Sequence, residues 1–363
     1  MDKQHLITEL QSHGLKLVEQ EVGAAGRKGG AGPSDHKAVT IEGTTVMVPV
    51  FTGASAQSPY TAKLESGAVT LLRQEEAIAP ISFPQQPQFY SLTTAEGIPY
   101  RKIALLHSQD VLATTVLQTC MRYADTESAC QFCAIGQSLE AGRTIARKSP
   151  AQLAEVAEAA VRLDGVKHMI MTTGTPNTND RGAAYLTECV RAVKQRVNLP
   201  IQVQCEPPDD FVWFDRLKAA GVDSLGMHLE AVDPAVRARI MPGKADVPVE
   251  FYFQAFAAAV PIFGWGQVST YLLAGLGDSL ETLVEASDRL IQMGVYPFVV
   301  PFVPISGTPL AEQPAPSSEF MYSLYQQVSA LLNRAGLSSA AMKAGCGKCG
   351  ACSALSTFEK ASA

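Results

Sequence analysis

The sequence predicts an α/β fold, a parallel (βα) barrel of the TIM type that is either full or partial. Two observations support this prediction: strand-like and helix-like segments alternate along the chain, and the strand-like segments are polar on one face. Such alternation is typical of a parallel sheet whose strands are joined by helices. The six predicted strands lie near residues 111–119, 166–173, 199–206, 222–230, 266–274 and 295–303, and two of the predicted helices span 150–163 and 183–196.

The polarity of the strands predicts what fills the barrel. Side chains alternate between the two faces of a strand, and on three of the strands every second residue is mostly polar. Because helices cover the outside of such a barrel, the apolar face is expected to point outward and the polar face to line the lumen. A polar lumen indicates a ligand cavity; the alternative is a packed lumen whose polar groups bond to one another. The residues expected in the lumen are Gln202, Gln204, Glu206, Gly226, His228, Glu230, Gln267, Ser269 and Tyr271.

An N-terminal extension is predicted before the barrel. Residues 3–20 carry apolar residues at helical spacing, and two β-hairpins are predicted at 38–51 and 60–72. The Gly-rich stretch 23–34 lacks the Gly-Lys-Ser/Thr ending of a phosphate-binding loop and is expected to be a plain linker. The expected division of the chain is 1–105 for this extension, which covers one end of the core, 106–312 for the barrel, and 313–363 for a C-terminal helix and Cys-rich tail.

Composition limits the class of protein. With 363 residues, of which 47% are hydrophobic and 18% charged, the chain can bury the core of one large domain, alone or with a smaller one. A net charge of −6 gives no general attraction to nucleic acid, so a small-molecule substrate is expected. No apolar run reaches the roughly 20 residues of a membrane span. The first residues lack a secretory apolar region, so we expect a cytoplasmic protein that contacts neither membrane nor nucleic acid.

Six of the eight cysteines fall in two tight trios, which indicates metal ligation in a reducing compartment rather than disulfides. The first trio, Cys120, Cys130 and Cys133, follows the first predicted strand with C-x9-C-x2-C spacing, and Phe132 precedes the last thiol. Three thiolates can hold three irons of a cubane cluster and leave the fourth iron open to a ligand. A structural zinc site needs four protein ligands, so zinc is the weaker alternative, although the spacing alone leaves both open.

This order of strand, cysteine loop and helix resembles the radical S-adenosylmethionine (SAM) superfamily. The resemblance implies a [4Fe-4S] cluster on the first trio whose open iron chelates SAM, with Phe132 beside the cofactor. The nine-residue gap is longer than the common spacing of the superfamily and matches a known variant. Segment 299–310, with its Gly-Thr-Pro-Leu ending, closely resembles biotin synthase-like members, and the branch suggested is one encoded beside nitrilase genes in bacteria.

Later motifs extend the resemblance to the biotin synthase and lipoyl synthase group. Residues 171–175 (Met-Thr-Thr-Gly-Thr) stand in place of the Gly-Gly-Glu stretch that binds the methionine amino group of SAM, and they resemble the Thr-Ser segment of lipoyl synthase. Segment 221–244 resembles the region that holds the ribose, although His228 could equally face the substrate. Segment 272–281 resembles the Gly-x-Gly-acid turn beside the adenine, a turn that also occurs without function. The cofactor-binding residues implied are Phe132, Thr172, Thr173, Gly174, Glu206, His228, Glu230, Arg239, Gly275 and Gly277.

The second trio, Cys346, Cys349 and Cys352, has C-x2-C-x2-C spacing with small residues between the thiols, which lets one loop wrap a cluster. A second iron–sulfur cluster is the preferred interpretation, with an unknown fourth ligand for which Ser353 and Ser356 lie near. A zinc knot and a pair of redox thiols remain as alternatives. The remaining cysteines, Cys189 and Cys205, are expected to be core thiols, with Cys205 facing away from the lumen.

The function that the resemblance implies is that of a radical SAM enzyme. The reduced cluster would cleave SAM to methionine and a 5′-deoxyadenosyl radical, which takes hydrogen from a small polar substrate near Gln204, His228 and Tyr271, the candidate catalytic residues. A reducing partner such as flavodoxin or ferredoxin is implied, and the extension or the Cys-rich tail is a candidate lid. Sulfur insertion competes with rearrangement or fragmentation as the reaction. The alternatives from other classes are an iron–sulfur carrier without catalysis and a zinc-bound binding module.

Overall fold

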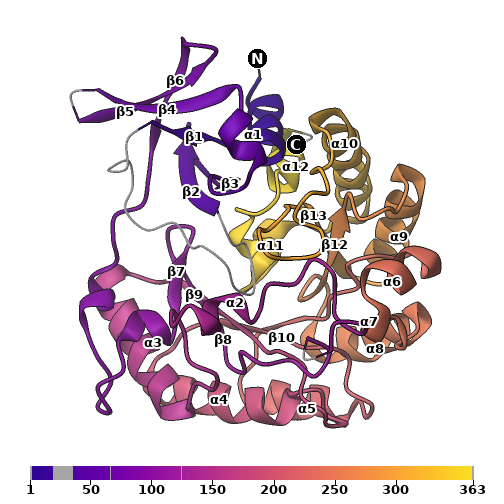
Figure 1. Ribbon diagram of the computed structural model, residues 1–363. Helices are drawn as coiled ribbons and strands as arrows, with labels where there is room; N and C mark the ends of the chain where they lie inside the picture. The colour runs from indigo at the N-terminus through magenta and orange to yellow at the C-terminus, as the bar shows by residue number, and fades with distance from the viewer. Residues whose placement is uncertain (1, 19–35, 66, 124, 362–363) are drawn as a thin grey trace.

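Figure 1 shows two β-sheets and the helices around them in the computed structural model, which describes residues 2–18, 36–65, 67–123 and 125–361. The larger sheet has seven strands in the order β13-β12-β11-β10-β9-β8-β7, and the smaller has six in the order β1-β4-β5-β6-β2-β3. The predicted linker at 23–34 lies outside the described residues. Within the described ranges, no helix combines the length and apolar character needed to span a membrane.

The larger sheet is a partial barrel. Strands β8 to β13 pair in parallel in chain order, β7 adds an antiparallel strand beside β8, and β7 and β13 form the two edges. The α/β prediction is therefore confirmed in its partial-barrel form, and each of β8 to β13 lies within a predicted segment. The strands are β7 (Leu105–His107), β8 (Val111–Thr115), β9 (His168–Thr172), β10 (Ile201–Gln204), β11 (Ser224–Gly226), β12 (Val268–Ala274) and β13 (Val295–Pro301).

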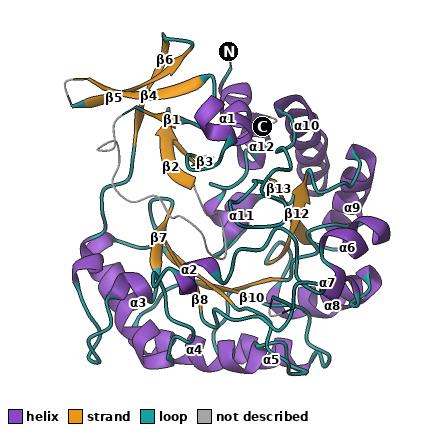
Figure 2. Ribbon diagram, in the orientation of Figure 1, coloured by secondary structure: helices purple, strands orange, loops and turns teal. Residues whose placement is uncertain are grey.

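Helices cover the outer face of this sheet (Figure 2). In α3, Ser149 and Gln152 form a capping box at the start, and Gly165 in the left-handed conformation ends the helix. The two helices predicted at 150–163 and 183–196 are confirmed as α3 and α4. The helices of this part are α2 (Gln137–Glu140), α3 (Pro150–Asp164), α4 (Ala183–Arg196), α5 (Val212–Ala219), α6 (Pro234–Ile240), α7 (Pro242–Ala245), α8 (Val249–Phe263), α9 (Leu280–Gln292), α10 (Ser318–Ala335), α11 (Cys346–Cys349) and α12 (Leu355–Ala361).

The N-terminal part begins with a helix that is shorter than predicted. The predicted helix 3–20 is wrong beyond His13, because Gly14 has φ 75° and a Cβ there would meet the Pro49 carbonyl oxygen at 2.6 Å. The predicted hairpins are present as the antiparallel pairs β2/β3 and β4/β5, whereas β6 was not predicted. The elements are α1 (Lys3–His13), β1 (Lys16–Leu17), β2 (His36–Ile41), β3 (Thr44–Pro49), β4 (Tyr60–Glu65), β5 (Ala68–Arg73) and β6 (Glu76–Ser82).

The C-terminal tail enters the lumen of the partial barrel, and Figure 1 shows α11 in the middle of the curled sheet. At the start of β12, the Gln267 side chain donates to the Ala341 carbonyl at 3.0 Å and accepts from the Lys343 N–H at 2.9 Å. On β10, the side-chain amide oxygen of Gln202 accepts from the Cys346 N–H at 3.2 Å. The tail therefore packs the deep lumen, whereas the alternative interpretation of the polar strands expected their polar groups to bond only to one another.

The smaller sheet and α1 lie against the same tail. The Met47 N–H on β3 donates to the Ala351 carbonyl at 2.7 Å, and the Gln11 amide on α1 donates to it at 3.3 Å. One hydrophobic core includes buried side chains from all three parts, such as Leu10, Val203 and Leu355. The N-terminal part and the tail therefore pack together on one side of the barrel.

Glu359 on α12 fixes the tail to β13, and replacing this glutamate is expected to weaken the attachment of the tail. Its buried carboxylate accepts from the Tyr296 hydroxyl and, at 2.9 and 2.8 Å, from the Ser339 N–H and Oγ–H. Glu359→Ala leaves these donors buried without an acceptor and is expected to lower the free energy of unfolding by about 2–4 kcal/mol. Guanidinium denaturation and hydrogen exchange over residues 339–361 measure the effect. The exposed Glu188→Ala serves as the control, and equal effects of both substitutions would contradict the prediction.

Candidate active site

A cavity of about 350 Å³ lies at the carboxyl ends of the parallel strands, where a barrel of this kind builds its site. It lies between the sheet and the N-terminal part, because Gln11, His36 and Met47 line it from the other side. The residues predicted for the site that line the cavity are Cys120, Cys130, Phe132, Cys133, Thr172, Thr173, Gly174, Gln204, Glu206, His228, Glu230, Tyr271 and Cys352.

The loop that carries the first trio is fixed by contacts to two neighbouring segments. The Met121 N–H donates to the Thr175 carbonyl at 2.8 Å, and the Gln131 N–H donates to the Ile240 carbonyl at 2.8 Å. Gly174 lies against the same loop, where a Cβ would meet the Thr119 carbonyl oxygen at 2.2 Å. The close backbone contact explains why glycine stands at 174 and how the loop is held over the strand ends.

The thiols of Cys120, Cys130 and Cys133 all line the cavity, and their donor set fits an iron–sulfur cluster. Among the described residues, no three His, Cys, Asp or Glu side chains converge on a point that a single metal ion would occupy. A cubane cluster gives each thiolate its own iron, so its ligands do not need to converge. Burial raises the pKa of Cys133 to about 12 and also raises the pKa of Cys130. The thiolates are therefore formed when a metal binds, which couples loading to proton release.

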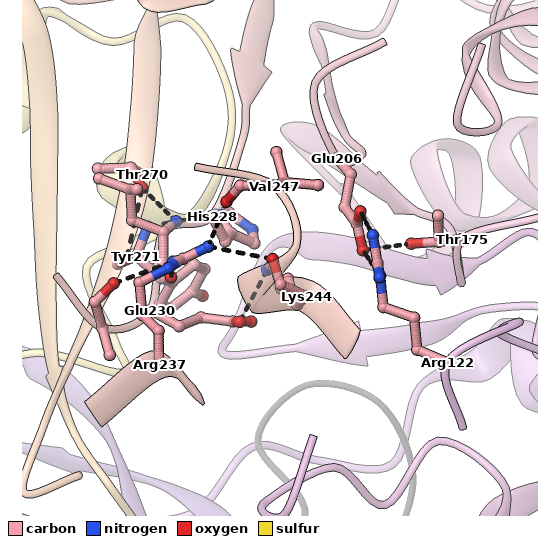
Figure 3. Close-up of polar contacts among 12 residues, drawn as sticks. Arg122, Thr175, Glu206, His228, Glu230, Arg237, Lys244, Val247, Thr270 and Tyr271 are labelled. Carbon is pink, nitrogen blue, oxygen red and sulfur yellow. Dashed lines mark hydrogen bonds and ion pairs between the residues drawn. The ribbon is translucent and has the colours of Figure 1, made fainter. Parts of the chain in front are cut away.

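Arg122 and Glu206 form a buried bidentate ion pair beside the cavity (Figure 3). Arg122 Nε and Nη2 donate to the two Glu206 carboxylate oxygens at 2.9 and 2.8 Å, and Thr175 Oγ1 donates to Oε1 at 2.9 Å. Burial alone would raise the pKa of Glu206, but the hydrogen bonds from Arg122 and Thr175 and the positive charges of Lys244 and Arg122 together outweigh burial and lower the pKa. Glu206 therefore stays ionised, and Arg122 joins the cysteine loop to the end of β10.

Lys244 and Glu230 form a second pair on the opposite side, 2.7 Å apart. Glu230 has φ 67°, a strained conformation for a side chain of this size, and it pairs as an isolated bridge with Leu272. The predicted strand 222–230 therefore ends early, at Gly226. Burial alone would lower the pKa of Lys244, but the nearby acidic groups, Glu230 first among them, together outweigh burial and raise it. Lys244 therefore stays charged in the folded protein.

The segment between these pairs is held by Arg237, whose guanidinium is fully buried. It donates to the carbonyls of Leu229 and Ala231 at 2.9 and 3.1 Å, and to those of Lys244 and Val247 at 3.2 and 3.0 Å (Figure 3). Arg237 therefore fixes the strand end that carries His228 and Glu230 against the turn that carries Lys244.

His228 presents a hydrogen-bond donor to the cavity. Its Nδ1 accepts from the Tyr271 backbone N–H at 3.2 Å, so the proton of the neutral ring lies on Nε2. Nε2 is buried and has no hydrogen-bond partner among the described residues. Burial and the nearby Lys244 lower the pKa of His228 to about 3, so the imidazole is neutral at physiological pH.

Gln204 and Tyr271, predicted as catalytic, lie between the two cysteine trios. The Gln204 side-chain amide donates to the Gln202 side-chain amide oxygen at 2.8 Å and lies 3.1 Å from Cys346 Sγ, and the Tyr271 hydroxyl lies near the same thiol. The second trio therefore borders the candidate site on the side of the lumen. No local sequence pattern indicates that the two trios lie near each other.

Three residues predicted to bind the cofactor, Arg239, Gly275 and Gly277, do not line the cavity. Arg239 donates instead to the Leu276 carbonyl at 2.9 Å, and its guanidinium fills the space beside Gly277. These residues therefore hold the turn after β12 together. Cys189 and Cys205 lie in the hydrophobic core as predicted, although Cys205 also borders the cavity edge.

The sequence analysis missed Arg122 and Lys244, which both line the cavity. The available signals were weak: Arg122 lies two residues after Cys120, and Lys244 ends the Met-Pro-Gly-Lys segment. Their roles depend on carboxylates far away in sequence, 84 residues from Arg122 in the case of Glu206.

Comparisons with known proteins give a family match and several relatives. A family model described as the radical SAM superfamily matches residues 126–290. Bacteriochlorophyllide c C-7(1)-hydroxylase of Chlorobaculum limnaeum is 25% identical over 349 residues, which cover 90% of this chain and 84% of that relative. Lipoyl synthase of Bacillus thuringiensis (strain Al Hakam) is 30% identical over 169 residues, 45% of this chain, and the match spans 52% of the synthase, about half its length. The crystal structure of methylornithine synthase is similar with a TM-score of 0.48 and 17% identity, over 68% of this chain and 71% of that one.

Loss of Arg122 is expected to destabilise the protein far more than loss of a surface arginine. Arg122→Met leaves the Glu206 carboxylate buried without its partner, so we expect the free energy of unfolding to fall by about 3–5 kcal/mol. Arg196, which pairs with Glu158 at 3.2 Å on the surface, is the matched control, and Arg196→Met is expected to cost less than about 1 kcal/mol. Urea denaturation of both variants measures the difference. Similar midpoints would contradict a structural role for the buried pair.

Proposed function

We propose that this chain, a member of the radical SAM superfamily, binds SAM at the cluster of Cys120, Cys130 and Cys133 and takes hydrogen from a small polar substrate in the adjoining cavity. Membership of the superfamily implies a [4Fe-4S] cluster and SAM, and an enzyme of this kind needs a reductant and a substrate. The observation that carries the proposal is that all three thiols open onto one cavity at the strand ends.

Cys120, Cys130 and Cys133 would hold a [4Fe-4S] cluster, and its chemistry when bound would be reductive cleavage of SAM to methionine and a 5′-deoxyadenosyl radical. The chain contributes placement and exclusion of water. Thr173 Oγ1 donates to the Gly174 carbonyl at 2.8 Å, so the 172–175 turn presents a fixed backbone to the methionine end of SAM. The neutral His228 offers its Nε2–H, and Glu230 a carboxylate, to the ribose hydroxyls.

The relatives support hydrogen removal from carbon as the common first step. One is named a hydroxylase and the other a lipoyl synthase. The polar groups around this cavity, with two buried ion pairs, favour a substrate that carries its own hydrogen-bonding or charged groups. We propose such a small polar molecule as the substrate and flavodoxin or ferredoxin as the reductant.

We propose that the second trio holds a second iron–sulfur cluster. Its thiols are packed against lumen residues that border the same cavity, which favours a role for that cluster close to the substrate rather than at a remote surface. A cluster in that position could anchor the substrate, pass an electron or supply sulfur. Gly345 and Gly347 support the fit, because a Cβ at these positions would meet Gln202 at 2.2 Å and Met342 Sδ at 2.3 Å. Side chains at these glycines would therefore lift the loop off the sheet.

The proposed activity predicts 5′-deoxyadenosine from the anaerobically reconstituted, dithionite-reduced protein incubated with SAM. Cys133→Ala removes a cluster ligand at the cavity, so we expect its yield to fall at least a hundredfold. Cys189→Ala is the matched control, because it removes a buried thiol from the core away from the cavity, and it is expected to keep the wild-type yield. Liquid chromatography with mass detection measures the product. Wild type at the level of Cys133→Ala would contradict the proposal.

The proposed role of His228 predicts weaker binding of SAM when its donor is removed. His228→Phe keeps a flat ring but loses Nε2–H, so a cost of about 1.4–3 kcal/mol, or roughly 10- to 150-fold in Kd for SAM, is expected. Equilibrium dialysis with labelled SAM on the reconstituted protein measures it, with the exposed His13→Phe as control. An unchanged Kd would contradict a hydrogen bond from His228 to SAM.

A further inference from the structure

Each thiol of the second trio lies near a different polar side chain. Cys346 Sγ lies 3.1 Å from the Gln204 amide nitrogen, and the Cys349 thiol lies near the Ser108 hydroxyl. Cys352 Sγ lies 3.4 Å from Nε2 of His107. The last contact brings a common metal ligand to a group of three thiols.

We propose that His107 is the fourth protein ligand of the metal centre at Cys346, Cys349 and Cys352. This inference rests on the proposed function, which includes a second iron–sulfur cluster at that trio. The resulting ligand set is three thiolates and one imidazole, bound through Nε2 of His107.

The serines near the trio in sequence are occupied elsewhere. Ser353 Oγ donates to the Val299 carbonyl at 2.5 Å and accepts from the Leu355 N–H at 3.2 Å, where α12 begins. Ser356 lies under Gly350, on the side where a Cβ of that glycine would point. Neither Ser353 nor Ser356 forms a hydrogen bond with a thiol of the trio. His107, which lies beside Cys352 in space, is therefore the better ligand.

The imidazole is also the better donor among the side chains that do contact the trio. A hydroxyl such as that of Ser108 or Tyr271 must lose its proton to bind iron strongly, which a neutral imidazole does not need to do. A neutral imidazole binds iron–sulfur clusters without adding negative charge. Because the three cysteines are half-buried, a fourth ligand that adds no charge costs less in desolvation than a fourth anion.

The fold fixes His107 in this position. It is the last residue of β7, opposite Val111 on β8, at the edge of the larger sheet. Ser108 follows with φ 57°, a left-handed turn that is unusual for serine. His107 and Cys352 are 245 residues apart in sequence, and the docking of the tail in the lumen brings them together.

The test isolates the second site in the full-length chain. Cys120→Ala/Cys130→Ala/Cys133→Ala removes the first site, and reconstitution with iron and sulfide is then expected to give about four irons per chain. Pulsed EPR of the dithionite-reduced sample, prepared with ¹⁴N- or ¹⁵N-histidine, is expected to show a nitrogen coupling that changes with the isotope. His107→Ala in this background is expected to abolish the coupling, whereas the exposed His13→Ala keeps it.

His107→Ala could lose the nitrogen coupling simply because it loses the whole cluster, and His107→Cys is the variant that distinguishes these two cases. It is expected to retain the iron, lack the nitrogen coupling, and have a more negative reduction potential, because a thiolate adds negative charge. A full cluster without isotope-dependent coupling, or coupling that survives His107→Ala, overturns the assignment of His107 and leaves the proposed enzyme standing. Zinc or no metal at the second site would contradict the proposed second cluster and, with it, the assignment of His107. Formation of 5′-deoxyadenosine by the wild type tests the radical SAM activity separately.

Discussion

Two buried ion pairs determine how this site is built. Arg122 with Glu206 and Lys244 with Glu230 bring four side chains of charged type into the buried cavity wall, which is tolerable because each has an oppositely charged partner. The pairs also connect separate parts of the chain: the cysteine loop, the ends of β10 and β11, and α7. The ion pairs that balance the charges of the cavity wall therefore also hold the first trio over the strand ends.

The C-terminal tail gives the barrel a polar floor. A partial barrel leaves polar lumen side chains exposed, and here the amides of Gln202, Gln204 and Gln267 bond to the tail or to one another. Because of those bonds, the lumen is packed at one end and open to a ligand at the other. The amino ends of the strands are packed by the tail, and the carboxyl ends remain open as the cavity.

The sequence predicted those features that depend on local periodicity. Alternation along a strand has a period of two, so the polar lumen face that carries Gln204, His228 and Tyr271 could be identified without a structure. Contacts between distant segments could not be identified in this way. Arg122 finds Glu206, and His107 finds Cys352, only through the fold, and the early end of β11 depends on the strained backbone of Glu230. The first helix is shorter than predicted for a local reason, because Gly14 ends it after His13.

The size of the cavity limits what can occupy it together. Its volume of about 350 Å³ lies near the lower end of the range for small-molecule sites, about 300–1,000 Å³. A bound nucleoside cofactor would take up most of that space, so the substrate must be small or the wall must move. The wall opposite the strands consists of Gln11, His36 and Met47, and Gln11 and Met47 bond to Ala351 of the tail. Movement of the N-terminal part would therefore disturb the loop that carries Cys352, which couples access to the cavity to the second cysteine trio.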